Sequence, residues 1–162
     1  MCVALFGVLL AAVYRYDNKY TAGPPYGEGG VFLLTENDLD QPIFLIDGWL
    51  LNGQEVFIGE YSNFSFLPGG ASPFGTGNYE LTLRYDGEPV TLLLEIPPIF
   101  TEYTLALNGR PAAQTGSGTQ VAVPLGQGDV RISLHTVNRS HYYSGLTYPP
   151  ALGTAQAMGH LA

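Results

Sequence analysis

The segment Tyr79-Glu-Leu-Thr-Leu-Arg-Tyr85 decides the fold class of this chain. Apolar and aromatic residues occupy every second position, and polar residues occupy the positions between them. A period of two places alternate side chains on opposite faces of a β-strand, so the segment predicts a strand with one buried face. Asp86-Gly87 follows as a turn signal, and we expect residues 90–96 to form the returning strand.

Other stretches on both sides carry strand signals of the same kind. Residues 130–135 alternate strictly between apolar and polar, which leaves His135 on the exposed face of a strand. Residues 104–107 are closed by the turn signal Asn108-Gly109. Shorter apolar runs stand at 31–34, 43–46, 56–58 and 121–123. The chain therefore predicts an all-β fold of about eight antiparallel strands, arranged as a sandwich or barrel.

The composition agrees with a single folded domain. The 162 residues include 21 glycines and 12 prolines, which argue against long helices. The net charge of −8 and the lack of a Lys/Arg cluster exclude a nucleic-acid-binding role, because that role needs a basic surface. Cys2 is the single cysteine, so an intrachain disulfide and a cysteine-based zinc site are excluded as well.

The N-terminal segment differs from the rest of the chain. Residues 1–13 are uncharged and mostly apolar. As a helix they would span roughly 20 Å, less than the roughly 30 Å hydrocarbon core of a membrane. Tyr14, Tyr16 and Tyr20 follow, with two cations, as is typical of a membrane interface. We expect residues 1–20 to be the outer part of a membrane-anchor helix with its juxtamembrane segment; the alternative is a buried element of a soluble domain.

The remaining chain divides into three parts. Residues 21–30, with two prolines and four glycines, are expected to be a linker that buries little. Residues 31–153 hold all the strand signals and form the expected domain. Residues 154–162 are expected to be a tail that leads toward a following segment.

Three segments in order resemble the galactose-binding-like jelly roll. They are a strand that ends in Asn108-Gly109, then Gly116 with the short strand 121–125, and then the long strand 128–138 that ends in Asn. The resemblance implies a jelly-roll sandwich of the kind found in carbohydrate-binding modules and in accessory domains of glycoside hydrolases.

A narrower resemblance rests on the ends of the chain. Residues 18–25, 45–49, 61–64 and 140–153 together look like the extracytoplasmic sensor region of bacterial membrane-bound sensor histidine kinases. That region is related to the extracellular jelly roll of seven-transmembrane diverse-signalling receptors. The chain lacks the dimerisation helix and the ATP-binding domain of such a kinase, so the resemblance implies the sensing part only.

Four residues are the candidate ligand-binding residues. His141, Tyr142 and Tyr143 stand between a long strand and two prolines, where a loop with adjacent tyrosines could stack on a sugar face. The alternative is that one of these tyrosines closes the end of the sandwich. Trp49, the single tryptophan, is either a stacking platform or, in our preferred interpretation, a core anchor.

Catalytic and metal-binding signals are weak. No nucleophile elbow, zinc-protease motif or phosphate loop occurs, so we expect no catalytic residues, no metal and no cofactor. The stretch 36–40 is rich in oxygen ligands of the kind that calcium prefers, but it lacks the EF-hand spacing. A solvated acidic turn is our preferred interpretation of this stretch.

The sequence thus leads to two hypotheses. The main one is an extracytoplasmic ligand-sensing domain of a sensor histidine kinase, held at the cell membrane by its N-terminal helix. The alternative is a carbohydrate-binding accessory module of a secreted glycoside hydrolase. Both imply no enzymatic activity within this chain, a small-molecule or carbohydrate ligand, and no nucleic acid partner, and both leave a homodimer open.

Overall fold

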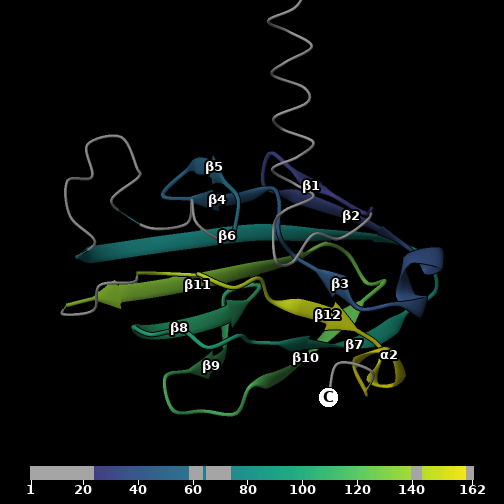
Figure 1. Cartoon of the computed structure of the whole chain (residues 1–162). Helices are drawn as coiled ribbons and strands as arrows, with labels where there is room; N and C mark the ends of the chain where they lie inside the picture. The colour runs from purple at the N-terminus through teal and green to yellow at the C-terminus, as the bar shows by residue number, and fades with distance from the viewer. Residues whose placement is uncertain (1–23, 59–63, 65–73, 140–143, 160–162) are drawn as a thin grey trace, which may run out of the picture.

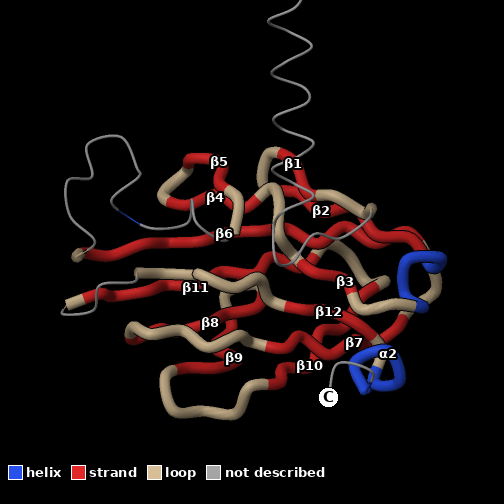
Figure 2. Tube along the Cα trace, in the orientation of Figure 1, coloured by secondary structure: helices blue, strands red, loops and turns tan. Residues whose placement is uncertain are grey.

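The computed structural model describes residues 24–58, 64, 74–139 and 144–159. Within these residues the chain forms two β-sheets that enclose one hydrophobic core (Figure 1). Strands dominate, and the described helical segments lie toward the same end of the molecule in this view (Figure 2). The expected all-β sandwich is confirmed.

The larger sheet carries eight strands. Its main path runs β1-β2-β6-β11-β8-β9, and β4 pairs with both β5 and β6 beside this path. In chain order the strands are β1 (Gly27–Glu28), β2 (Val31–Thr35), β4 (Trp49–Leu51), β5 (Gln54–Val56), β6 (Gly75–Asp86), β8 (Glu102–Leu107), β9 (Arg110–Gln114) and β11 (Val130–Asn138).

The smaller sheet carries four strands in the order β10-β7-β12-β3. The helical segments are a 3₁₀-helix, η1, and a short α-helix, α2. The bounds of these elements are β3 (Ile43–Phe44), β7 (Val90–Glu95), β10 (Gln120–Leu125), β12 (Ala151–Gly153), η1 (Glu36–Asp40) and α2 (Ala155–Gly159).

The alternation in β6 and β11 sets the core. Tyr79, Leu81 and Leu83 of β6 are fully buried, and the polar residues between them face outward. The same alternation in β11 buries Ile132 and exposes His135, as the sequence predicts. Since β7 contributes further buried leucines from the opposite sheet, the two sheets pack face to face.

The described strands number twelve, more than the expected eight, and one pair is parallel. Strand β2 runs parallel to β6, with Val31 opposite Thr82 and Thr35 opposite Asp86. The remaining pairs among the described strands are antiparallel. Parallel neighbours need a long connection, and the chain between β2 and β6 supplies one because it contains β3, β4 and β5. The expectation of a wholly antiparallel fold was therefore wrong.

The strand after the Asp86-Gly87 turn does not return beside β6. Strand β7 lies in the smaller sheet, where β10 and β12 flank it. The reason is that other strands occupy the two edges of β6, β2 at residues 82–86 and β11 at residues 75–83. Strand β2 pairs along one edge and β11 along the other, so the chain must cross to the second sheet.

The ends of the folded unit differ from the expectation. Gly27–Glu28 forms β1 and pairs with β2, so the expected linker 21–30 contributes a strand to the sheet. At the other end, Ala157 and Met158 of α2 are buried, and the Met158 side chain lies against Gly153. The expected tail therefore packs on the sandwich over residues 155–159. The expected anchor helix, residues 1–20, lies outside the described residues.

The described part of the chain contains no helix that is long and apolar enough to cross a membrane.

Candidate functional site

Trp49 lies in the core. Its side chain is 1% exposed, and its indole Nε1–H donates a hydrogen bond of 2.7 Å to the Leu45 carbonyl. The indole meets the buried Tyr79 ring edge-on, with 6.3 Å between centroids. Of the two alternatives for this residue, the structure supports the core anchor, because a ring with no accessible face cannot stack on a ligand.

His141, Tyr142 and Tyr143 lie outside the described residues, so their proposed role stays a prediction. The residues that follow them are firmly held. The Phe64 amide donates to the Ser144 hydroxyl at 3.1 Å, and the Leu146 amide donates to the Tyr79 hydroxyl at 3.1 Å. Burial raises the pKa of the Tyr79 hydroxyl well above its usual value.

The acidic stretch 36–40 forms the 3₁₀-helix η1. Thr35 and Asp38 make a reciprocal capping box at its start, and the Glu36 carboxylate accepts a 2.7 Å hydrogen bond from the Glu88 amide. The Asp38 carboxylate thus caps the start of this helix, and the Glu36 carboxylate holds the turn that contains Glu88. Both carboxylates therefore have a structural role. No group of three or more His, Cys, Asp or Glu side chains within the described residues could hold a metal ion.

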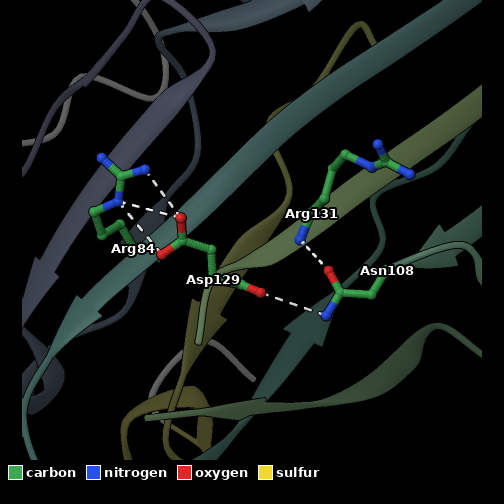
Figure 3. A network of polar contacts seen from close by, with 4 residues as sticks. All are labelled: Arg84, Asn108, Asp129 and Arg131. Atoms are coloured by element: carbon green, nitrogen blue, oxygen red, sulfur yellow. Dashed lines mark hydrogen bonds and ion pairs between the residues drawn. The ribbon is translucent and has the colours of Figure 1, made fainter. Parts of the chain in front are cut away.

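Asn108 begins the Asn-Gly turn that was expected after the strand 104–107. Its side chain holds the β8–β9 turn against β11. Its side-chain Oδ1 accepts a 2.8 Å bond from the Arg131 amide, and its Nδ2 donates to the Asp129 carbonyl at 3.4 Å (Figure 3). Beside it, Arg84 Nη2 contacts Asp129 Oδ2 at 2.9 Å, and this hydrogen bond raises the pKa of Arg84. The network is exposed and connects β6 to the start of β11 and to the β8–β9 turn.

A cleft lies at the edge of the larger sheet, between the hairpins β1–β2 and β4–β5. Both hairpins pair with the same edge of β6, β4 at residues 79–80 and β2 at residues 82–86, so they lie side by side along it (Figure 1). The cavity between them has a volume of about 350 Å³. We call it the edge cleft; its lining residues are Tyr26, Gly27, Glu28, Asp47, Gly48, Glu55, Val56 and Phe57.

Two glycines allow the walls of the edge cleft to come together. Gly48 has a φ of +79°, and a Cβ there would lie 2.5 Å from the backbone nitrogen of Glu28. A Cβ on Gly27 would meet the backbone oxygen of Asp47 in the same way. The Gly30 amide then bonds to the Gly48 carbonyl at 2.8 Å. Backbone therefore packs directly on backbone at this point, which a side chain would prevent.

The lining of the edge cleft combines aromatic rings with carboxylates. Tyr26 is 49% exposed and Phe57 is 39% exposed, so each presents part of its ring to solvent. Glu28 and Glu55 are exposed as well, whereas Asp47 is only 4% exposed. The Gly29 amide donates a 2.9 Å hydrogen bond to Glu55 Oε1 and so positions that carboxylate across the two hairpins.

Sequence reasoning missed the edge cleft. The sequence analysis overlooked strands β1 and β4. Strand β4 could have been found, because Asn52-Gly53 between β4 and β5 is a strong hairpin signal and both residues have positive φ. That signal would have identified the second hairpin. It would not have placed Tyr26 and Phe57 on the same cleft, since that depends on two separate pairings with β6.

Comparisons with known proteins bear on the fold. No protein-family model matches the chain, and no curated protein matches it. Among solved structures, the chain is similar to a GH2 β-galacturonidase from Eisenbergiella tayi bound to galacturonate, with a TM-score of 0.51 and 15% identity over 70% of this chain. An FMN-binding β-glucuronidase from Facaelibacterium prausnitzii L2-6 gives a TM-score of 0.49 and 18% identity over 69% of this chain.

The chain spans about a quarter of the length of these glycosidase chains, 24% and 22%. At 15% identity the first likeness concerns the fold alone, and it agrees with the β-sandwich expected from the sequence. Nothing in the comparisons supports the narrower resemblance to a sensor histidine kinase.

Proposed function

We propose that this chain is a carbohydrate-binding accessory module and that the edge cleft holds the sugar. The observation that carries the proposal is the lining of the cleft: two partly exposed aromatic rings, Tyr26 and Phe57, beside the carboxylates of Glu28 and Glu55. Aromatic rings stack on the apolar face of a pyranose, and carboxylates accept hydrogen bonds from its hydroxyl groups.

The size and position of the edge cleft agree with this role. Its volume of about 350 Å³ falls in the range of small-molecule sites. Four of its lining residues lie in the paired strands β1 and β5, and Tyr26 and Phe57 are the residues next to these strands in the chain. Strands hold side chains more rigidly than loops do. The β-sandwich is also similar to part of a chain that is a glycosidase, which supports a sugar as the ligand class.

The proposal assigns binding, and not hydrolysis, to this chain. The sequence carries none of the catalytic motifs considered above, and the likeness covers only 24% of the glycosidase chain. We therefore expect any hydrolytic activity to belong to a neighbouring domain. An extracytoplasmic location is part of the same proposal, because polysaccharides are encountered outside the cytoplasm.

The test is a glycan-array screen of the full chain, followed by titration of the best hit against variants. Tyr26→Ala and Phe57→Ala are each expected to weaken binding by up to about tenfold, because each removes one aromatic contact. Phe100→Ala is the matched control, since Phe100 is 46% exposed and does not line the edge cleft.

Two results would contradict the proposal. One is an array without any carbohydrate hit; the other is a hit that survives both cleft substitutions and is lost in Phe100→Ala. Turnover of aryl glycosides by the isolated chain would contradict the assignment of binding without catalysis.

A further inference from the structure

The edge cleft is closed at one end. The Gly29 amide donates a 2.9 Å hydrogen bond to Glu55 Oε1, and this bond joins the turn of the β1–β2 hairpin to strand β5. The next residue of the turn, Gly30, donates to the Gly48 carbonyl at 2.8 Å. The two hairpins are therefore tied to each other at the β1–β2 turn, so a ligand that lies between them cannot continue past this end.

The aromatic residues lie at the other end of the edge cleft. In one wall Tyr26 stands three residues before Gly29, and in the other wall Phe57 stands two residues after Glu55. At about 3.3 Å per residue of extended chain, each ring begins roughly 7–10 Å from the hydrogen bond that closes the cleft. Both rings are partly exposed, so the cleft meets the solvent at this end.

The floor between the two ends is backbone. A Cβ on Gly48 would lie 2.5 Å from the carbonyl carbon of Gly27, so the two segments touch through their main chains. Backbone cannot move aside by a change of rotamer, so the cleft cannot deepen here. Its volume of about 350 Å³ is near the lower limit of the range of roughly 300–1,000 Å³ that is typical of small-molecule sites. The edge cleft therefore has room for a small ligand and not for a long chain.

We propose that the edge cleft holds the terminal unit of a glycan chain and excludes internal segments. This inference rests on the proposed carbohydrate-binding function and names its ligand class, which is chain ends and short oligosaccharides. The chain enters past Tyr26 and Phe57, whose rings stack on the sugar, and its last unit stops at Glu55. The Glu55 carboxylate, held in place by the Gly29 amide, accepts hydrogen bonds from the hydroxyl groups of that unit, because an ionised carboxylate offers about four acceptor positions.

The experiment is calorimetric titration of the full chain with oligosaccharides of increasing length. The probes are the di-, tetra- and hexasaccharides of β-1,4-linked galactose, β-1,4-linked mannose and β-1,3-linked glucose. In a series that binds, we expect nearly the same affinity per chain at all three lengths, because units outside the cleft make no contact with it.

The polysaccharide of the same series supplies a second measurement. Limited hydrolysis by an endo-acting glycosidase multiplies the chain ends while the mass of sugar stays constant. We expect the amount of bound protein to rise in proportion to the number of ends.

Matched variants locate the effect. Glu55→Ala is expected to weaken disaccharide binding about fivefold, as the loss of one hydrogen bond gives. Glu55→Gln keeps a carbonyl oxygen for the Gly29 amide and should lose less than Glu55→Ala. Glu88→Ala is the control, because it removes a carboxylate that lies outside the edge cleft. Thermal unfolding of each variant checks that the fold is intact.

The outcomes separate this inference from the proposed function. A tenfold rise in affinity from the disaccharide to the hexasaccharide, or bound protein that stays constant when the polysaccharide is hydrolysed, refutes recognition of chain ends and leaves carbohydrate binding intact. The same holds if an array glycan binds but its own di- and tetrasaccharides do not. If no oligosaccharide and no array glycan binds, the proposed function fails first. Binding that is independent of length but unchanged in Glu55→Ala also overturns the inference, because the end is then recognised elsewhere.

Discussion

Substitution of Gly48 by alanine is the sharpest test of how the edge cleft is built. Gly48 has a φ of +79°, a conformation that costs an L-residue roughly 1–2 kcal/mol. In addition, the new Cβ would lie 2.5 Å from the Glu28 nitrogen and 2.5 Å from the Gly27 carbonyl carbon. Ordinary van der Waals contact begins near 3.4 Å, and backbone atoms cannot move aside by changing a rotamer.

The clash can be relieved only by moving β1 away from the turn that contains Gly48. Such a shift would weaken the 2.8 Å hydrogen bond from the Gly30 amide to the Gly48 carbonyl, which is worth about 1 kcal/mol. Together with the φ strain, we expect Gly48→Ala to lower the free energy of unfolding by about 3 kcal/mol. Since β1 carries Glu28, the affinity for the sugar is expected to fall as well.

Gly53→Ala is the matched control. Gly53 has nearly the same φ, +83°, but a Cβ there would meet nothing within 4 Å. It should therefore show the φ strain alone, roughly 1–2 kcal/mol. Urea unfolding followed by circular dichroism measures both variants. Equal losses for Gly48→Ala and Gly53→Ala would refute the close backbone approach and with it the described shape of the edge cleft.

Two further predictions concern the core. Tyr79→Phe removes the acceptor of the Leu146 amide and should lower the free energy of unfolding by about 1–3 kcal/mol. Burial also raises the pKa of Tyr79 in the folded state. The contribution of Tyr79 to the free energy of unfolding is therefore complete below pH 10 and is lost as the pH rises further. In urea titrations between pH 9 and 11, Tyr79→Phe should reduce this loss of stability at alkaline pH. Trp49→Phe should lower the free energy of unfolding by about 2 kcal/mol, because it leaves a cavity and removes the indole hydrogen bond, and it should leave the sugar affinity unchanged. A large loss of affinity in a stable Trp49→Phe protein would restore the hypothesis that Trp49 stacks on the ligand.

The faces of the long strands could be read from the sequence because the signal is local. The alternation of apolar and polar residues over 79–85 and 130–135 predicts which side chains point inward, and this prediction does not depend on the partner strands. The Asn108-Gly109 turn could be read for a similar reason, since both residues adopt the positive φ that such a hairpin needs. Strands β1, β3 and β12, with two or three residues each, are too short to show a period.

The candidate site could not be read in the same way. Trp49 was chosen as a candidate because it is a single, large aromatic residue, and only the structure shows its indole inside the core. Tyr26 was expected within a linker, and Glu55 attracted no attention as an isolated carboxylate. Their neighbourhood arises because two hairpins, separated along the chain, pair with one edge of β6.

By itself, the sequence determined the fold class and the inward faces of β6 and β11, since each depends on composition or on neighbours in the chain. The tertiary structure alone decided that β2 lies parallel to β6, that β7 crosses to the second sheet, and that a cleft opens between the two hairpins. The physical reason is that a period of two specifies the face of a strand but not its partner. The partner of a strand depends on which sheet edges the other strands leave free, and this depends on the fold of the whole chain.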